Sequence, residues 1–314
     1  MYINATGYYI PAGRVPNEYF FDVNGLTSDW IYQRTGILSR SKAGVGENTN
    51  TMAIQAVKNM QVSLPYDVKD FDLIVGASYS PFDTVYTLAH NVQRECDIHD
   101  AQVLYLSSAC SSFVNAMEVV QGYFAMGKAS KALVIAADHN TFYGNEEDPK
   151  AGHLWGDGAV AVAFSKERVT ANDSELLDVY TRGLAYMGKA DIAVSLRPKT
   201  RGISMPEGKD VFIYACKYMK EALMLVLERN GLTTKDLNYM AGHQANMRIL
   251  AHVAQELDLE KSSLLVNIEQ LGNTGCPSNM IAISQNWKNF KKGDLIGGTV
   301  FGGGYSCGAY LIRY

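Results

Sequence analysis

The sequence predicts an α/β protein with largely parallel sheets. Apolar runs typical of strands alternate with amphipathic helical segments along all 314 residues, and such alternation favours parallel strands that are buried on both faces. A second series of these units begins near Glu175. We therefore expect two halves, residues 1–170 and 171–314, that each run strand, helix, strand.

Composition excludes several classes of protein. The hydrophobic share of 47% and the charged share of 19% are those of an ordinary globular protein, and the net charge of −4 argues against a general nucleic-acid or anionic-membrane binder. The 5 cysteines are an odd number without CxxC pairs, so neither a disulfide framework nor a zinc site is expected. Neither a signal peptide nor an 18-residue apolar stretch is apparent, which predicts a cytoplasmic protein.

In the first half, caps and turn residues bound the expected elements. Thr27 precedes a short helix that Gly36 ends, and Gly44-Val45-Gly46 lacks the third glycine of a dinucleotide-binding loop. Strands are expected at residues 3–11, 71–78, 103–106, 132–138 and 159–164, and helices at 27–37, 48–60, 88–96 and 113–124.

Cys110 lies where one of these strands turns into a helix. Small residues surround it, and Phe113, Met117, Val120 and Phe124 then recur at helical spacing. A thiol at the start of a helix meets free N–H groups and the positive end of the helix dipole, which favour the thiolate. The alternative is a buried structural cysteine, the usual fate of a free one.

In the second half, helices are expected at residues 211–230, 247–257 and 279–287, with strands at 238–243 and at the C-terminal end. Three motifs accompany them: His243 at a strand end, Asn273 in a glycine-rich turn, and Phe301-Gly302-Gly303-Gly304 with its bare backbone N–H groups. Each has an ordinary structural explanation when taken alone. Together with Cys110 they supply a nucleophile, an imidazole, an amide donor and oxyanion-hole donors, the groups needed for acyl transfer through a thioester.

Along nearly its whole length the sequence resembles the beta-ketoacyl-acyl-carrier-protein synthase III family of the thiolase superfamily. The matching motifs are Ile3-x-x-x-Gly7-x-Tyr9-x-Pro11, Trp30-Ile31-x-x-Arg34-Thr35-Gly36-Ile37, Ala109-Cys110-Ser111-x-Phe113, Gly156-Asp157-Gly158-Ala159, Val211-Phe212, His243-Gln244-Ala245-Asn246-x-Arg248-Ile249, Gly272-Asn273-Thr274 and Phe301-Gly302-Gly303-Gly304. The resemblance implies a duplicated thiolase fold, with five alternating layers of helix and sheet, an active site between the halves, and a homodimer.

The resemblance also implies the chemistry. Cys110 would carry the acyl group, with His243 and Asn273 completing a Cys-His-Asn triad, and the backbone N–H groups of Cys110 and Gly303 would form an oxyanion hole. A malonyl thioester on acyl carrier protein would then lose CO₂ and attack the acyl-cysteine. No metal or cofactor is expected, because coenzyme A or carrier-protein thioesters are the substrates, and the five other histidines show no metal-ligand spacing.

Further residues are expected to bind substrate. By resemblance, Trp30 and Arg34 would face the nucleotide end of coenzyme A, while Arg248 and Lys150 would meet phosphate or the acidic carrier protein. Ser112, which stands where the family usually has glycine, and Tyr86, at a position where an aromatic crosses the dimer interface, would line the acyl pocket. The segment from Tyr180 to Lys209 is expected to help shape it.

Two alternatives share this fold. One is an acyltransferase that moves an acyl group to an alcohol or amine without decarboxylation, although relatives of that kind often carry aspartate where Asn273 stands. The other is a non-catalytic subunit of a heterodimer, which would tend to lose the nucleophile or the histidine, whereas Cys110 and His243 are both present. A degradative thiolase would need a second cysteine where Val300 and Phe301 stand.

Overall fold

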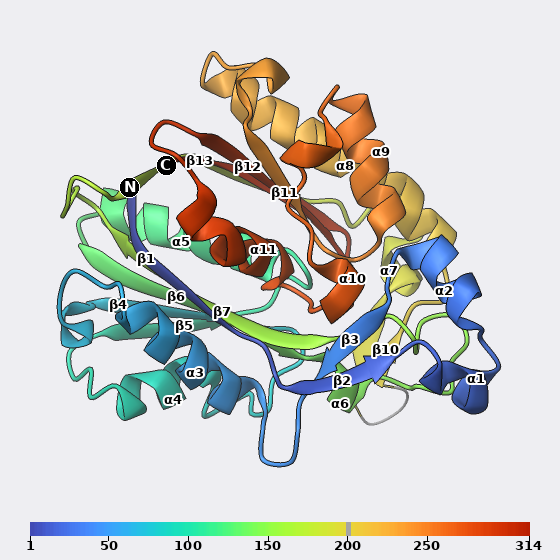
Figure 1. Ribbon diagram of the computed structural model, residues 1–314. Coiled ribbons are helices and arrows are strands. Elements are labelled where there is room, and N and C mark those ends of the chain that lie inside the picture. Colours follow the sequence, from blue (N-terminus) through green and yellow to red (C-terminus); the bar gives the residue numbers. More distant parts are fainter. Residues whose placement is uncertain (199–201) are drawn as a thin grey trace.

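Alternating layers of helix and sheet make up the structure, a computed structural model that describes residues 1–198 and 202–314 (Figure 1). Two sheets enclose a central layer of helices, α5 (Ser112–Ala125) and α11 (Ser278–Asn286). Two pairs of helices cover the outer faces: α3 (Thr49–Gln61) with α4 (Leu88–Glu95), and α8 (Gly208–Arg229) with α9 (Met247–Glu256). This is the five-layered thiolase architecture that the resemblance implied.

A short junction joins the two sheets into one large, 9-stranded sheet. One has the strand order β1-β7-β6-β4-β5 and the other the order β11-β12-β13-β8. They join where Tyr2 pairs with Glu175 and Ile3 with Ser174. The strands are β1 (Tyr2–Tyr9), β4 (Leu73–Ala77), β5 (Gln102–Leu106), β6 (Lys131–His139), β7 (Asp157–Ser165), β8 (Ser174–Gly183), β11 (Tyr239–Gly242), β12 (Leu295–Gly302) and β13 (Ser306–Arg313).

The expectation of largely parallel sheets is wrong. Only β4 with β5, β4 with β6, and β11 with β12 are parallel in the described large sheet, and the other pairs are antiparallel. A parallel pair needs a long crossover, usually a helix. The chain instead returns directly from β12 to β13 through the glycine turn at Gly303, which makes a hairpin. Burial on both faces holds for β7, all of whose residues are buried.

The predicted helices form close to the expected bounds. In α2 (Ser28–Thr35), the Thr27 hydroxyl accepts the Trp30 N–H at 3.2 Å, and Gly36 ends the helix in the left-handed conformation at φ 75°. At the start of α3, the Asn48 side chain likewise accepts the N–H groups of Asn50 and Thr51. None of the described helices is long and apolar enough to cross a membrane.

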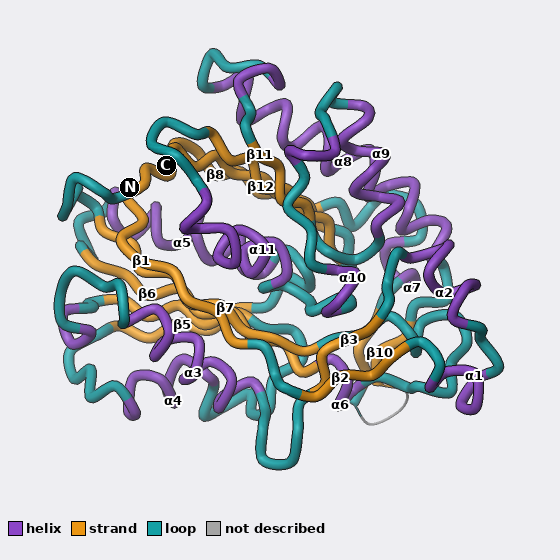
Figure 2. The backbone as a smooth tube through the Cα atoms, viewed as in Figure 1, coloured by secondary structure: helices purple, strands orange, loops and turns teal. Residues whose placement is uncertain are grey.

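Several elements were not predicted because their sequences lack a clear apolar period. They include the short helices α1 (Tyr19–Asn24), α6 (Asn140–Tyr143), α7 (Ala190–Ala193) and α10 (Ile268–Leu271). Two small sheets, β2 (Gly13–Pro16) with β3 (Ser39–Lys42) and β9 (Ser195–Arg197) with β10 (Gly202–Ser204), lie beside the large one (Figure 2).

A buried carboxylate at the end of β6 links segments from both halves of the chain. Asp138 Oδ1 accepts hydrogen bonds from the Ser78 hydroxyl, the Tyr79 N–H, and both the N–H and the hydroxyl of Ser80, at 2.8–3.2 Å. Its Oδ2 accepts the Cys276 N–H at 2.7 Å. The loop after β4 and the turn before α11 are therefore held against one side chain.

We predict that Gly275→Ala destabilises the protein through this contact. Gly275 has φ +78°, and a Cβ there would lie 2.2 Å from Asp138 Oδ2. Gly231 is the matched control, since it has φ +67° and nothing within 4 Å of the same position. Gly231→Ala should cost only the backbone strain of about 1–2 kcal/mol, and Gly275→Ala about 1–3 kcal/mol more from overpacking. Equal free energies of unfolding by denaturant titration would contradict this account.

Candidate active site

A tight turn between β5 and α5 presents Cys110. Ala109 adopts the left-handed conformation at φ 49°, and Ser111 is the N-cap residue of α5. The Ser112 hydroxyl accepts the Ser108 N–H at 2.8 Å and donates to the Ala109 carbonyl at 2.6 Å. These bonds close the turn and leave Cys110 partly exposed at its apex.

Burial opposes ionisation of the Cys110 thiol. Burial, reinforced by the negative charge of Asp138, raises its pKa to about 12, although hydrogen bonds from the Gly303 and Cys110 N–H groups act to lower it. Burial therefore works against the thiolate that the start of α5 would favour. The cost of removing a thiolate from water here exceeds the stabilisation that the positive N-terminal end of α5 would give it.

His243 follows β11 and is held in one orientation. Its N–H donates to the Thr299 carbonyl at 2.9 Å, and its Nδ1 lies 2.8 Å from the Ser278 hydroxyl, which also accepts the Gln244 N–H at 3.2 Å. Burial lowers the pKa of His243 to about 4. The imidazole is therefore neutral near pH 7, with one nitrogen engaged and Nε2 left for another partner.

The amide of Asn273 is oriented by its own turn. Its Oδ1 accepts the Gly275 N–H at 3.0 Å, and its backbone carbonyl accepts the Gly156 N–H at 2.9 Å and the Asn140 amide at 3.2 Å. Within the described residues the Asn273 Nδ2 group donates no hydrogen bond, so its donors remain available.

The structure brings these groups together. Cys110, His243 and Asn273 line one cavity with Trp155 and Gly303. A second cavity of about 310 Å³ also contains Cys110, Trp155 and Gly303 in its wall. Residues 1–198 and 202–314 contain no cluster of three or more His, Cys, Asp or Glu side chains that could hold a metal ion.

Three of the predicted substrate-binding residues lie on two adjoining helices: Trp30 and Arg34 on α2, and Arg248 on α9. The Arg34 guanidinium lies over the Trp30 ring, 4.2 Å from its centre. The Asn246 amide, at the N-cap of α9, donates to the Arg34 carbonyl at 3.0 Å, which ties α2 to the helix that carries Arg248. The exposed Arg248 guanidinium lies 5.6 Å from the Phe212 ring centre. Two guanidinium groups are therefore displayed on adjoining helices.

The other predicted contacts lie apart from these cavities. Lys150 is exposed in a turn, where its N–H donates to Asp148. Ser112 is fully buried and its hydroxyl is engaged within the Cys110 turn, and Tyr86 is 41% exposed and stacks on His90. None of the three lines either cavity at Cys110.

The segment predicted to shape the pocket does so in part, since Val194, Ser195, Leu196, Ile203 and Met205 line the two cavities. Residues 199–201 of that segment lie outside the described residues. Sequence reasoning missed the cavity residues Tyr79 and Trp155 and the buried Asp138. Two signals were present: Trp155 directly precedes the Gly156-Asp157-Gly158 motif, and Asp138 is the polar end of an apolar strand.

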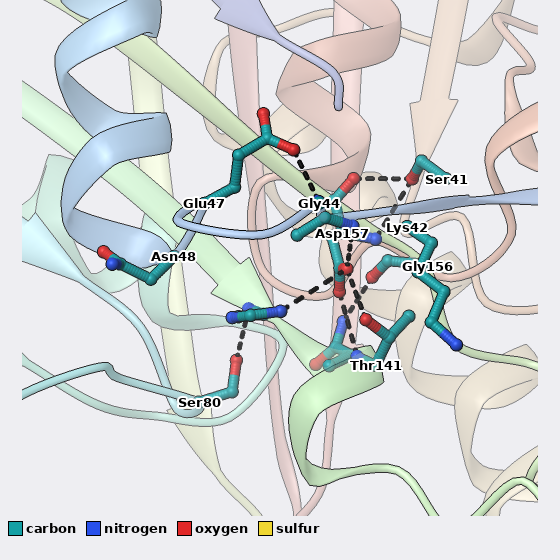
Figure 3. A network of polar contacts seen from close by, with 12 residues as sticks. Ser41, Lys42, Gly44, Glu47, Asn48, Ser80, Thr141, Gly156 and Asp157 are labelled. Carbon is teal, nitrogen blue, oxygen red and sulfur yellow. Dashed lines mark hydrogen bonds and ion pairs between the residues drawn. The ribbon is translucent and has the colours of Figure 1, made fainter. Parts of the chain in front are cut away.

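A polar network holds the strand that follows Trp155 (Figure 3). The Asp157 carboxylate accepts hydrogen bonds from the Thr141 N–H and hydroxyl and from the Ala43 N–H, at 2.5–2.9 Å. The Ser41 hydroxyl pairs with the Asp157 backbone, at 2.6 Å to its carbonyl and 3.0 Å to its N–H. This network fixes the start of β7, and with it the turn that bonds to Asn273.

Comparison with known proteins identifies the family. Residues 105–183 match the family described as 3-oxoacyl-[acyl-carrier-protein (ACP)] synthase III, and residues 227–314 match its C-terminal counterpart. The chain is 32% identical over 320 residues to a beta-ketoacyl-[acyl-carrier-protein] synthase III from Pasteurella multocida, with 99% of both chains covered.

Solved structures agree. A 3-oxoacyl-[acyl-carrier-protein] synthase III from Aquifex aeolicus superposes with a TM-score of 0.92 at 31% identity, over 100% of this chain and 99% of that one. The priming beta-ketosynthase of the R1128 polyketide pathway shares the fold, with a TM-score of 0.89 at 24% identity over 99% of this chain and 95% of that one. The chain therefore belongs to the beta-ketoacyl-[acyl-carrier-protein] synthase III family of enzymes.

Proposed function

We propose that this enzyme joins an acyl thioester to a malonyl thioester on acyl carrier protein, with loss of CO₂, through an acyl group carried on Cys110. One observation carries the proposal: a thiol, a neutral imidazole and an amide whose Nδ2 group donates no hydrogen bond among the described residues line a single cavity. Family membership supports the reaction class, since the similar proteins are named for the synthesis of beta-ketoacyl groups on a carrier protein.

In the first step the Cys110 sulfur attacks the thioester carbonyl of the acyl donor. The new bond joins sulfur to the acyl carbon, the old carbon–sulfur bond breaks, and the thiol proton ends on the departing thiolate. The Gly303 and Cys110 N–H groups act to lower the pKa of the Cys110 thiol, and together they form the donor pair for the oxyanion. Because burial keeps the free thiol protonated, this proton must move as the sulfur attacks.

In the second step His243 and Asn273 hold the thioester oxygen of the malonyl group. The Ser278 hydroxyl accepts the Gln244 N–H and can donate its own hydrogen to His243 Nδ1, and in that assignment the ring hydrogen lies on Nε2. Breakage of the bond to CO₂ leaves an electron pair in the enolate, which these donors stabilise. The enolate carbon then bonds to the acyl carbon, and the Cys110 sulfur departs and regains a proton.

The exposed arginines suit the anionic part of the substrate. Arg34 and Arg248 lie on adjoining helices and would meet the phosphates of coenzyme A or the acidic carrier protein, with Trp30 beside the nucleotide. The reaction requires no further cofactor. We also propose a homodimer in which Tyr86, exposed on the loop before α4, closes the acyl pocket of the second copy, and Lys150 adds positive charge for the carrier protein.

We predict that incubation with an acyl thioester adds one acyl mass to the peptide that contains Cys110. Cys110→Ala should abolish the addition. Cys96→Ala is the control, because Cys96 is another partly buried free thiol, placed at the end of α4 and outside both cavities. Intact-mass spectrometry followed by peptide mapping decides the matter, and labelling that survives in Cys110→Ala would exclude Cys110 as the acyl carrier.

We predict that Asn273→Asp separates the two steps. An aspartate oxygen can still accept the Gly275 N–H, but the second oxygen cannot donate to the thioester oxygen. Acylation of Cys110 should persist, while malonyl decarboxylation should slow by about 10²–10³, the usual effect of losing one oxyanion donor. Release of ¹⁴CO₂ from labelled malonyl carrier protein measures the second step. A normal rate would point to acyl transfer without decarboxylation.

We predict that Arg248→Glu weakens docking of the carrier protein. Reversing an exposed charge should raise the KM for malonyl carrier protein much more than that for a small malonyl thioester, and the difference should shrink at high salt. Lys128→Glu makes the same charge change at an exposed residue beyond the far end of α5 and should alter neither KM. Equal effects of Arg248→Glu on both substrates would argue against a docking role.

A further inference from the structure

The two backbone groups proposed as oxyanion donors come from segments that are far apart in the sequence. Cys110 lies in the turn before α5, and Gly303 lies in the turn between β12 and β13. The two segments are in close contact, since a Cβ added to Gly302 would lie 2.9 Å from the Cys110 nitrogen and 3.1 Å from the Ser111 nitrogen. Among the described residues no backbone hydrogen bond joins these segments. Side chains must therefore fix the distance between the two donors.

A pair of serine hydroxyls links the two segments. Ser306 Oγ lies 2.5 Å from Ser111 Oγ, across 195 positions of the sequence, and 3.4 Å from the Ser108 carbonyl oxygen. Because the Ser111 hydroxyl donates to the Ser108 carbonyl at 2.8 Å, its oxygen can accept the Ser306 hydroxyl hydrogen. The link therefore runs from the start of β13 directly into the turn that carries Cys110.

The positions of both serines suit this link. Ser111 is the N-cap residue of α5, where a serine hydroxyl ordinarily accepts an N–H of the first helical turn. Its hydroxyl caps no N–H of the described helix, and the residue is fully buried. Ser306 pairs with Gly302 in the β12–β13 hairpin and so closes the base of the turn that presents Gly303. The two hydroxyls join the start of α5 to the base of that turn.

We propose that the Ser111–Ser306 hydroxyl pair sets the spacing of the two oxyanion donors, and that Ser306 is a positioning residue for acyl transfer to Cys110. This inference rests on the proposed acyl-Cys110 function, with the Cys110 and Gly303 N–H groups as donors. Neither serine lines either of the two cavities at Cys110, so the pair acts through the backbone and not on the substrate. Misplacement of a reacting group by about 1 Å can cost about 100-fold in rate.

Ser306→Ala removes the link and leaves the bond between Ser111 and Ser108 in place. The substrate is the coenzyme A thioester that loads the wild-type enzyme fastest, chosen from straight-chain and branched acyl groups. Rapid quenching followed by intact-mass spectrometry gives the rate of acylation at each thioester concentration. We expect the limiting rate to fall about 10-fold, part of the 10²–10³ that a lost donor costs, while the half-saturating concentration stays within about two-fold of the wild-type value.

Alkylation of Cys110 by iodoacetamide separates an effect on the donors from an effect on the sulfur. This displacement forms no oxyanion, so its rate reports on the thiol alone, and peptide mapping distinguishes Cys110 from the other cysteines. In Ser306→Ala the alkylation rate should stay within about three-fold of the wild-type rate, because burial remains the largest influence on the pKa of the thiol.

Ser284→Ala is the matched control. The Ser284 hydroxyl lies 2.9 Å from the Thr6 hydroxyl, and this second pair joins α11 to β1 across 278 positions of the sequence. Ser284 is buried and lies outside both cavities at Cys110. Its loss should lower the unfolding temperature and leave the acylation rate unchanged, so a loss of stability alone would not explain slow acylation.

Ser111→Ala and the double variant test whether the two hydroxyls act as one pair. Ser111→Ala breaks the same link, so it should also slow acylation more than alkylation. Its addition to Ser306→Ala should have little further effect, because the link is already absent. If Ser306→Ala does not fold, Ser111→Ala alone carries the same expectations for acylation and alkylation.

The proposal is overturned if Ser306→Ala is acylated at the wild-type rate, if its alkylation slows as much as its acylation, or if Ser284→Ala slows acylation equally. Effects that multiply in the double variant also overturn it, since the hydroxyls would then act independently. If no thioester adds mass to Cys110 of the wild-type enzyme, the proposed acyl-enzyme function itself fails, before any variant is compared.

Discussion

One buried carboxylate positions both sides of the active site. Asp138 receives the Ser78–Ser80 loop on one oxygen and the Cys276 N–H on the other, and these segments are separated by nearly two hundred residues of sequence. A buried carboxylate is tolerated only when its oxygens are fully bonded, and removal of its partners leaves a costly uncompensated group. The placement of the Asn273 turn and of Tyr79 therefore depends on a single side chain that lines neither cavity at Cys110.

The same dry environment acts in opposite ways on the two reacting side chains. Loss of hydration raises the pKa of Cys110 and lowers that of His243, because both groups are pushed toward their uncharged forms. For His243 the result suits the proposed chemistry, since a neutral ring with Ser278 at Nδ1 offers a directed donor at Nε2. For Cys110 it means that, in the proposed reaction, the thiol proton leaves as the sulfur attacks.

The sequence predicted most of the fold and the three proposed reacting residues, because these depend on local patterns. Apolar runs, the caps at Thr27 and Asn48, and the ordered motifs around Cys110 can all be read within short windows. Strand direction could not be read in that way, since it depends on whether the chain crosses over or turns back. The pKa of Cys110 was also beyond reach, because it results from burial by segments distant in sequence.

The helical and strand periods likewise say nothing of Tyr79 and Trp155, which reach the cavity wall from segments distant in sequence. Ser112 was predicted to line the acyl pocket because the family usually has glycine at this position. Its hydroxyl instead forms two hydrogen bonds within the Cys110 turn.

The small β9–β10 hairpin has a consequence for how such enzymes diverge. Its strands form a separate two-stranded sheet that is bridged to Gly144 through Ile203, and Ser195, Leu196 and Ile203 form part of the cavity wall. Replacements in this hairpin can reshape the wall without disturbing the large sheet. By contrast, Gly272 and Gly275 have positive φ angles and lie against Arg40 and Asp138, with no space for a side chain. Substitutions that alter the cavity wall are therefore easier to accommodate in β9 and β10 than in the turn that carries Asn273.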